Sequence, residues 1–181
     1  MFTSMLALTA AAITAGAVDD QAYTESSIET LPDGVIVIDD LHRVTGSGTE
    51  EDPYVTDWQL LMSASRVYKP KDDKLELPGW VKLFEGKRVK VQGFLAAPLF
   101  GGETDEILSM LNQWDGCCIG VPPTPYDAIE VKLSEPVPVF GLHASPTGTV
   151  VGVFRTDPYV VNDWLVGLYL MEDAVVDVEG F

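Results

Sequence analysis

Apolar and polar side chains alternate along much of the chain after Lys87, which is the pattern of β-strands with one buried face. Val89 and Val91 share one face of residues 88–92, and apolar side chains alternate with charged ones over residues 129–133. Comparable runs predict further strands over residues 94–97, 107–114, 136–142, 149–156, 164–171 and 174–178. Turn-forming side chains separate several of these runs, as at Asn162-Asp163.

Strands of this number and length predict a mainly β fold. Gly93 interrupts the first of them, which indicates a bulge or a bend. We therefore expect a small antiparallel barrel of about five to six strands over residues 87–178, similar to an OB fold. A small β-sandwich is the alternative architecture.

The residues before this barrel carry other signals. Residues 18–52 are polar and are expected to be flexible or extended, with one short β-branched run over residues 34–40. Asp52 and Pro53 then supply an N-cap and a first helical position, so a helix is predicted from there to about Val67.

A second short helical turn is expected around Trp80 and should stop at Gly86. Residues 53–86 are thus predicted as a helical extension, followed by a barrel domain over residues 87–181. Trp58, Trp80 and Trp164 lie on predicted apolar faces, so we expect these three indoles in the core.

The first 17 residues contain no charged side chain. Residues 5–13 are apolar, and Ala15-Gly16-Ala17 fits the small residues of a leader cleavage site. Residues 1–17 are therefore predicted to be a signal peptide, and the chain to be exported to the periplasm or secreted. The apolar run is short for a spanning helix, so no stable membrane insertion is expected after processing. No Lys or Arg precedes the run, which is atypical of a leader, and an ordinary N-terminal helix is the alternative.

The charge excludes some classes of partner. The formal net charge is -17, and residues 18–83 and 84–181 each hold 14 acidic side chains, so the acidity is spread along the chain. Such a surface repels phosphate backbones and anionic lipid. We therefore expect a protein partner and no nucleic acid.

The segment from Trp114 to Pro125 is the candidate functional site, because packing alone does not explain its composition. It holds both cysteines, Cys117 and Cys118, and then a proline-rich run over residues 121–125. Proline fixes φ and donates no backbone hydrogen bond, so this run should form a stiff, extended connection outside the strands.

The two cysteines allow four interpretations: packed thiols, a strained disulfide between neighbours, an intermolecular disulfide or soft-metal site, and a nucleophilic or redox centre. A zinc or copper ion would need further ligands, for which His143 and Asp115 are the candidates. The acidic surroundings oppose a reactive thiolate. No phosphate-binding loop, dinucleotide-binding or serine-hydrolase motif occurs, so we expect no catalytic residues.

The order of several motifs resembles a bacterial envelope family known as domain of unknown function 3299. The resemblance spans about residues 57–173, and its carriers are Trp58, Leu61, Gly86, Lys87, Val89, Val91, Gly93, Phe94, Gly116, Cys118, Pro122, Pro123, Pro125, Ile129, Val131 and Gly141. It implies an OB-like barrel and export, and for some members a gene that lies near those of metal-related or ABC-type transport systems. This chain departs from the family pattern at Gly120, where a His is usual, and at Asp127-Ala128, where an Asn-Gln pair is usual.

Together these patterns predict a non-catalytic, exported accessory or binding module of the bacterial cell envelope. Its partner is expected to be an envelope protein, such as a transport complex, recognised by the loop over residues 116–125. The expected binding residues are Trp114, Cys117, Cys118, Pro122, Pro123 and Tyr126. The alternatives are a zinc- or copper-binding accessory of metal transport, using Cys117, Cys118, His143 and Asp115, and a thiol redox protein.

Overall fold

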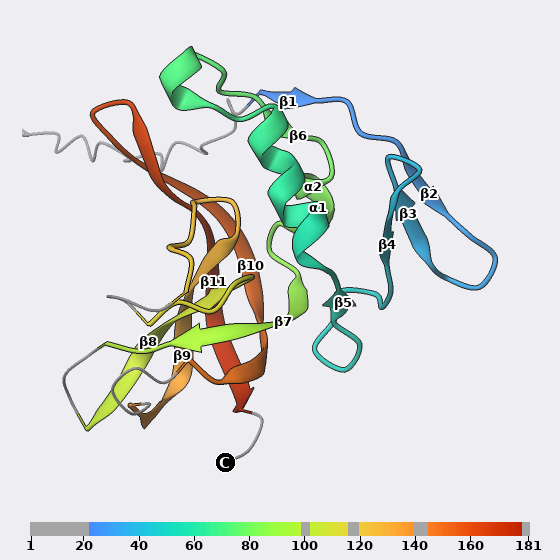
Figure 1. The fold of residues 1–181 in the computed structure, drawn as a ribbon. Helices are drawn as coiled ribbons and strands as arrows, with labels where there is room; N and C mark the ends of the chain where they lie inside the picture. Colours follow the sequence, from blue (N-terminus) through green and yellow to red (C-terminus); the bar gives the residue numbers. More distant parts are fainter. Residues whose placement is uncertain (1–21, 99–101, 116–119, 140–144, 179–181) are drawn as a thin grey trace, which may run out of the picture.

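The computed structural model describes residues 22–98, 102–115, 120–139 and 145–178. The fold is mainly β, as predicted, and five long strands build its main sheet within these ranges (Figure 1). They are β7 (Arg88–Ala96), β8 (Glu103–Met110), β9 (Ala128–Pro138), β10 (Thr147–Val161) and β11 (Trp164–Val178). Residues 136–142 were expected as a separate strand, but β9 continues to Pro138, and the two runs expected after residue 164 form the single strand β11.

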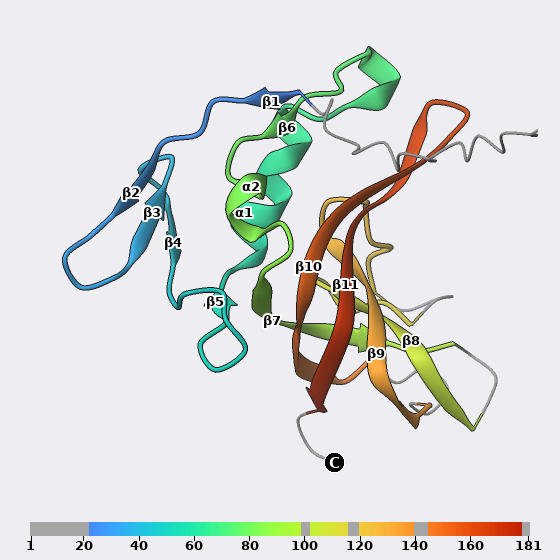
Figure 2. The same ribbon diagram turned by 180° about the vertical axis from the view of Figure 1, so that it is seen from behind.

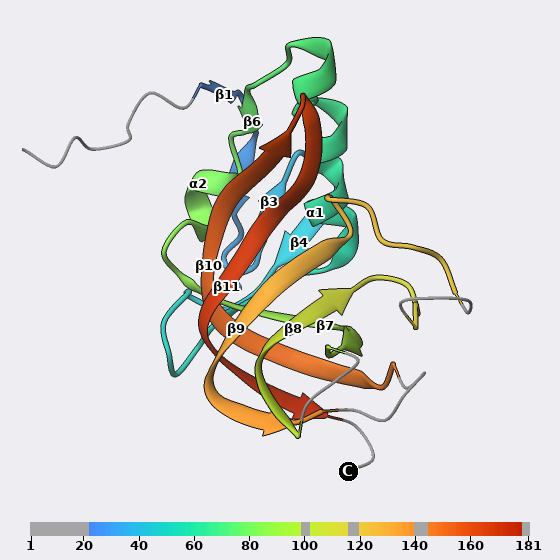
Figure 3. The same cartoon turned by 90° about the vertical axis from the view of Figure 1, so that its left-hand side faces the viewer.

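The five strands pair in a ring. The order is β10-β11-β9-β8-β7, and β7 also pairs with β10 (Figure 3). Every pair is antiparallel except β9–β11, so the expectation of a wholly antiparallel sheet is wrong there. The reason is parity: strand directions cannot alternate all the way around a ring with an odd number of members.

β7 closes the ring because it changes partner along its length. It pairs with β10 from Arg88 to Phe94 and with β8 from Phe94 to Ala96. The strand needs Gly93 at this change, as a Cβ there would lie 2.7 Å from the Met110 carbonyl oxygen. The predicted bend is thus a close approach between two backbones.

The residues before β7 form smaller elements. β2 (Ile28–Thr30), β3 (Ile36–Ile38) and β4 (His42–Val44) make a three-stranded antiparallel sheet, and β3 falls within the predicted run. β1 (Tyr23–Thr24) pairs in parallel with β6 (Leu77–Pro78). Figures 1 and 2 show the helices between the three-stranded sheet and the ring.

The helical segment begins later than the sequence pattern predicts. β5 (Tyr54–Val55) pairs in parallel with β7, which prevents a helix from starting at Pro53. Helix α1 (Trp58–Ser63) is instead capped by Asp57, whose carboxylate accepts from the Leu60 amide at 3.0 Å.

The rest of this segment is short helical turns. η1 (Ala64–Arg66) continues α1 almost to the predicted end, and η2 (Pro70–Asp72) follows it. Helix α2 (Val81–Phe84) stops before Gly86, which has a φ of +71°. This end agrees with the prediction.

An aromatic cluster joins the helical segment to the interior of the ring. Phe84 packs against Tyr54, Trp80 and Phe154 with ring centroids 5.7, 5.7 and 5.8 Å away. Phe154 in turn contacts Tyr169 at 5.4 Å. Trp80, Phe84 and Phe154 are fully buried, so α2 and the ring share one core.

Two hydrogen bonds fix α1 to the ring. Trp58 Nε1 donates to the Gln92 carbonyl oxygen at 2.8 Å, and Tyr169 Oη donates to the Leu61 carbonyl oxygen at 2.7 Å. Trp58 is buried, as expected. In the ranges that the structure describes, no helix is both long and apolar enough to cross a bilayer.

The buried Tyr169 predicts a loss of stability at alkaline pH. Burial raises the pKa of Tyr169 well above the usual 10.0, with a smaller contribution from the charge of Tyr126. The folded state therefore retains a proton that the unfolded chain releases above pH 10, so this stabilisation is complete below the unfolded pKa and is lost as pH rises beyond it.

We expect the free energy of unfolding to fall more steeply between pH 9 and 11 for the native chain than for Tyr169→Phe, by up to about 1.4 kcal/mol per pH unit. At pH 7 the variant should be about 1 kcal/mol less stable, because it lacks the bond to Leu61. Urea unfolding across this pH range measures both effects, and parallel pH profiles would contradict the assignment.

Candidate functional site

The described part of the proline-rich loop begins by pairing back onto the chain before it. Trp114 and Gly120 form an antiparallel bridge, and the Val121 amide donates to the Gln113 carbonyl oxygen at 3.0 Å. Val121 is 59% exposed, and Pro122 is exposed beside it. The loop therefore leaves the body of the protein from a fixed point and presents its apolar side chains to solvent.

Gly120 is required by this bridge. Its φ is +94°, and a Cβ there would lie 1.8 Å from the Gln113 carbonyl oxygen. Any side chain at this position collides with backbone, so the His that is usual in the resembling family does not fit this conformation. The backbone conformation therefore explains why this chain has glycine at position 120.

Asp127 fixes the other end of the loop. It is buried, and its Oδ1 accepts hydrogen bonds from both the amide and the hydroxyl of Thr124, the latter at 2.9 Å. Its carbonyl oxygen accepts from the Leu111 amide at 3.0 Å. A carboxylate bonded in this way closes a tight turn over residues 124–127 and leaves the loop little freedom.

Tyr126 connects the loop to the helical segment. Its hydroxyl donates to the Tyr68 carbonyl oxygen at 2.7 Å. The pKa of Tyr126 is raised by its partial burial and, to a smaller extent, by the charges of Tyr68 and Asp72. Tyr126 therefore acts as a neutral hydrogen-bond donor that holds the loop against residues 68–72.

The chain on either side of the cysteines is also anchored. Trp114 is half-buried and Asp115 is buried. The Ser145 hydroxyl donates to the Trp114 carbonyl oxygen at 2.7 Å. The segment that follows β8 and leads to the cysteines is thus bonded to the residues just before β10.

The structure places part of the predicted site together. Trp114, Pro122, Pro123 and Tyr126 all lie on the anchored loop, with Pro123 half-buried. The other predicted residues, Cys117, Cys118 and His143, lie outside the described ranges.

Asp115 is the one proposed metal ligand that the structure describes. Within residues 22–98, 102–115, 120–139 and 145–178, no three His, Cys, Asp or Glu side chains gather as a metal site.

The sequence pattern missed an exposed apolar surface on the β10–β11 hairpin. Its members are Tyr159, Val160, Val161, Trp164 and Val166. Trp164 was expected in the core but is 60% exposed, because β10 pairs with β7 only as far as Val153 and the hairpin continues past the ring (Figure 1). The available signal was the apolar run on each side of Asn162-Asp163, residues 159–161 and 164–166.

This hairpin surface and the proline-rich loop contact the same segment. Lys71 Nζ lies 3.9 Å above the Trp164 ring, a cation–π contact, and Tyr68 accepts the hydrogen bond from Tyr126. Residues 68–72 therefore link the two exposed surfaces.

The chain is similar to the crystal structure of a DUF3299 family protein from Pseudomonas aeruginosa PAO1. The sequence identity is 18% and the TM-score is 0.45, over 70% of this chain and 96% of that chain. This is the family that the motifs between Trp58 and Gly141 resemble. No family model matches the chain, and no curated protein matches it.

The close approach at Gly120 predicts a strong response to a single methyl group. Gly120→Ala should lower the free energy of unfolding by about 1–3 kcal/mol, because the added Cβ meets the Gln113 carbonyl at a positive φ. Gly102→Ala is the matched control, since nothing lies within 4 Å of its added Cβ. Urea unfolding compares the two, and an equal response would show that the bridge is not rigid.

Proposed function

We propose that this protein is a non-catalytic protein-binding module of the bacterial cell envelope. The expected location rests on the uncharged, apolar residues 1–17, which have the pattern of a leader. The recognition surface is the loop over residues 120–126 together with Trp114. The observation that carries the proposal is that this loop is anchored at both ends while Val121 and Pro122 between them are exposed.

The scaffold we propose is an OB-like barrel. The circular pairing of β7, β8, β9, β11 and β10 supports it, since an OB fold is a small five-stranded Greek-key barrel. Many such barrels bind nucleic acid, but a net charge of -17 opposes a phosphate backbone. A polypeptide partner fits this charge better.

Preorganisation gives the loop its advantage in binding. A flexible loop loses conformational entropy when it docks, whereas a loop already held by prolines and fixed hydrogen bonds loses little. The apolar side chains of Val121 and Pro122 supply area that a partner can remove from water. The loop is therefore suited to recognition by a surface rather than to chemistry.

Substitution of the prolines tests this role. Pro122→Ala with Pro123→Ala should weaken capture of a specific envelope protein by about tenfold. Each replacement makes the loop more flexible and so raises the entropic cost of ordering it by about 0.4–1 kcal/mol. The measurement is affinity capture from envelope extract, followed by titration of the captured protein against each variant.

Pro32→Ala is the control, since Pro32 is also exposed but lies in the turn between β2 and β3. Capture of the same proteins by the native chain and the double variant would refute the proposal.

A second candidate is binding of zinc or copper. The hydrogen bond from Ser145 to Trp114 favours it, because Ser145 lies two residues after His143 and Trp114 lies three residues before Cys117 in the sequence. The chain segments that carry the candidate ligands are thus joined at their described ends. Thiolate and imidazole are the ligands that these metals prefer.

Elemental analysis of the purified protein tests this candidate. After loading with zinc and gel filtration we expect about one equivalent of metal in the native chain and none in Cys118→Ser. Metal at background level in the native chain would refute zinc or copper binding.

A further inference from the structure

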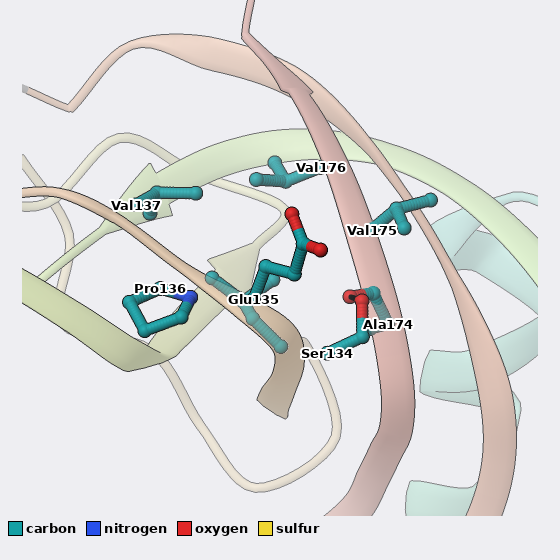
Figure 4. Close-up of a pocket in the computed structure, with 8 residues that line it drawn as sticks. Ser134, Glu135, Pro136, Val137, Ala174, Val175 and Val176 are labelled. Atoms are coloured by element: carbon teal, nitrogen blue, oxygen red, sulfur yellow. Dashed lines mark hydrogen bonds between the residues drawn. The ribbon is translucent and has the colours of Figure 1, made fainter.

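β9 and β11 separate after a short stretch of pairing. They pair at Leu170 with Glu130, at Met171 with Val131 and at Ala174 with Leu133, and no later pair follows among the described residues. Beyond this point an open groove of about 410 Å³ lies between residues 134–137 of β9 and residues 174–176 of β11 (Figure 4). This volume falls within the range of about 300–1,000 Å³ typical of ligand clefts.

Both strands are bulged beside the groove. Between the pairs Glu106–Lys132 and Thr104–Val137, β8 advances by two residues while β9 advances by five. Between the pairs Val153–Glu172 and Val151–Val175, β10 advances by two residues while β11 advances by three. The extra residues of a bulge do not take part in the ladder, and a bulge bends its strand.

An ion pair holds the bulge of β11 in place. Asp173 has a φ of +46°, and Arg88 on β7 donates to both its carbonyl oxygen and its carboxylate. One hydrogen bond crosses the groove, from the Ser134 hydroxyl to the Ala174 carbonyl oxygen at 3.1 Å. The gap between the strands is therefore a built feature of the ring.

The result is two strand edges that face each other without pairing. Within the described residues, 134–136 pair with no strand, and 175–178 pair only with β10. Unpaired strand edges are templates for an added strand, whose main chain supplies hydrogen bonds while alternate side chains supply specificity. Beyond the hydrogen bond from Ser134 to Ala174, an added strand can pair with residues 175–178 of β11 on one side and face residues 135–136 of β9 on the other.

The side chains that line the groove define the occupant. Val137, Val175 and Val176 are apolar, and Val175 is 57% exposed. In Figure 4 the Glu135 side chain extends from β9 toward Val176 on β11. The chain as a whole has a net charge of -17, so a basic segment is attracted and an acidic one is repelled.

We propose that this groove binds an extended polypeptide segment of alternating apolar and basic residues, which adds as a strand between β9 and β11. The site is separate from the proline-rich loop and does not depend on the function proposed for it. Its apolar positions would pack against the valines, and a basic position would pair with Glu135.

The test uses the full chain and a synthetic probe, the capped heptapeptide Lys-Val-Lys-Val-Lys-Val-Lys. We expect saturable binding by isothermal titration calorimetry, weakened by about tenfold or more in Val175→Arg, because this change places a like charge in the groove. Val166→Arg is the matched control, since Val166 lies on the same strand and is 54% exposed. It should bind as the native chain does.

Three further comparisons make the outcome decisive. The same peptide N-methylated at alternate residues should lose binding, since it lacks the ladder donors, and equal binding would show attraction by charge alone. Glu135→Gln should weaken binding without affecting the fold, because the side chain is exposed. Pro122→Ala with Pro123→Ala should leave peptide binding unchanged, which separates this proposal from the loop.

Two results would overturn the proposal. One is absence of binding to the native chain. The other is a concentration-dependent dimer in sedimentation that Val175→Arg abolishes, which would assign the groove to a second copy of this chain.

Discussion

The architecture depends on the double pairing of β7. Phe94 is paired with Met110 of β8 on one side and with Thr147 of β10 on the other, so the sheet returns to its starting strand. Closure of five strands forces one parallel pair, which falls at β9–β11. This is also where both strands bulge and separate. The groove and the ring thus have a common geometric origin.

The helical segment completes the molecule by joining the two exposed surfaces to the core. Phe84 buries itself against Phe154 of β10, and Tyr169 bonds to the α1 backbone. The segment that follows α1 then contacts Tyr126 of the proline-rich loop and the Trp164 ring of the hairpin. Because this segment is packed on the core and contacts both surfaces, the core holds the two surfaces in place.

Local pattern predicted the strands well because side-chain alternation reports directly on burial, as at Val89 and Val91. It failed where a distant partner decided the outcome. Asp52 and Pro53 are good helix starters, but pairing of Tyr54–Val55 with β7 moved the cap to Asp57. Trp164 looked like a core residue because a sequence does not reveal how far a hairpin projects past its sheet.

The candidate site was predictable only in part. The prolines and Tyr126 were identifiable from the sequence, and the structure places them in the loop. The anchors were not, because the Gln113 carbonyl beside Gly120 and the backbone oxygen of Tyr68 carry no side-chain signature. The groove lies beside two bulges, where β9 and β11 have more residues than the strands they pair with. A bulge of this kind is visible only once the register of the strands is known. Ring closure also constrains how the chain can fold. One side of β7 stays unpaired until the strand that begins at Thr147 has been synthesised, so folding has high contact order and must wait for residues 147–181.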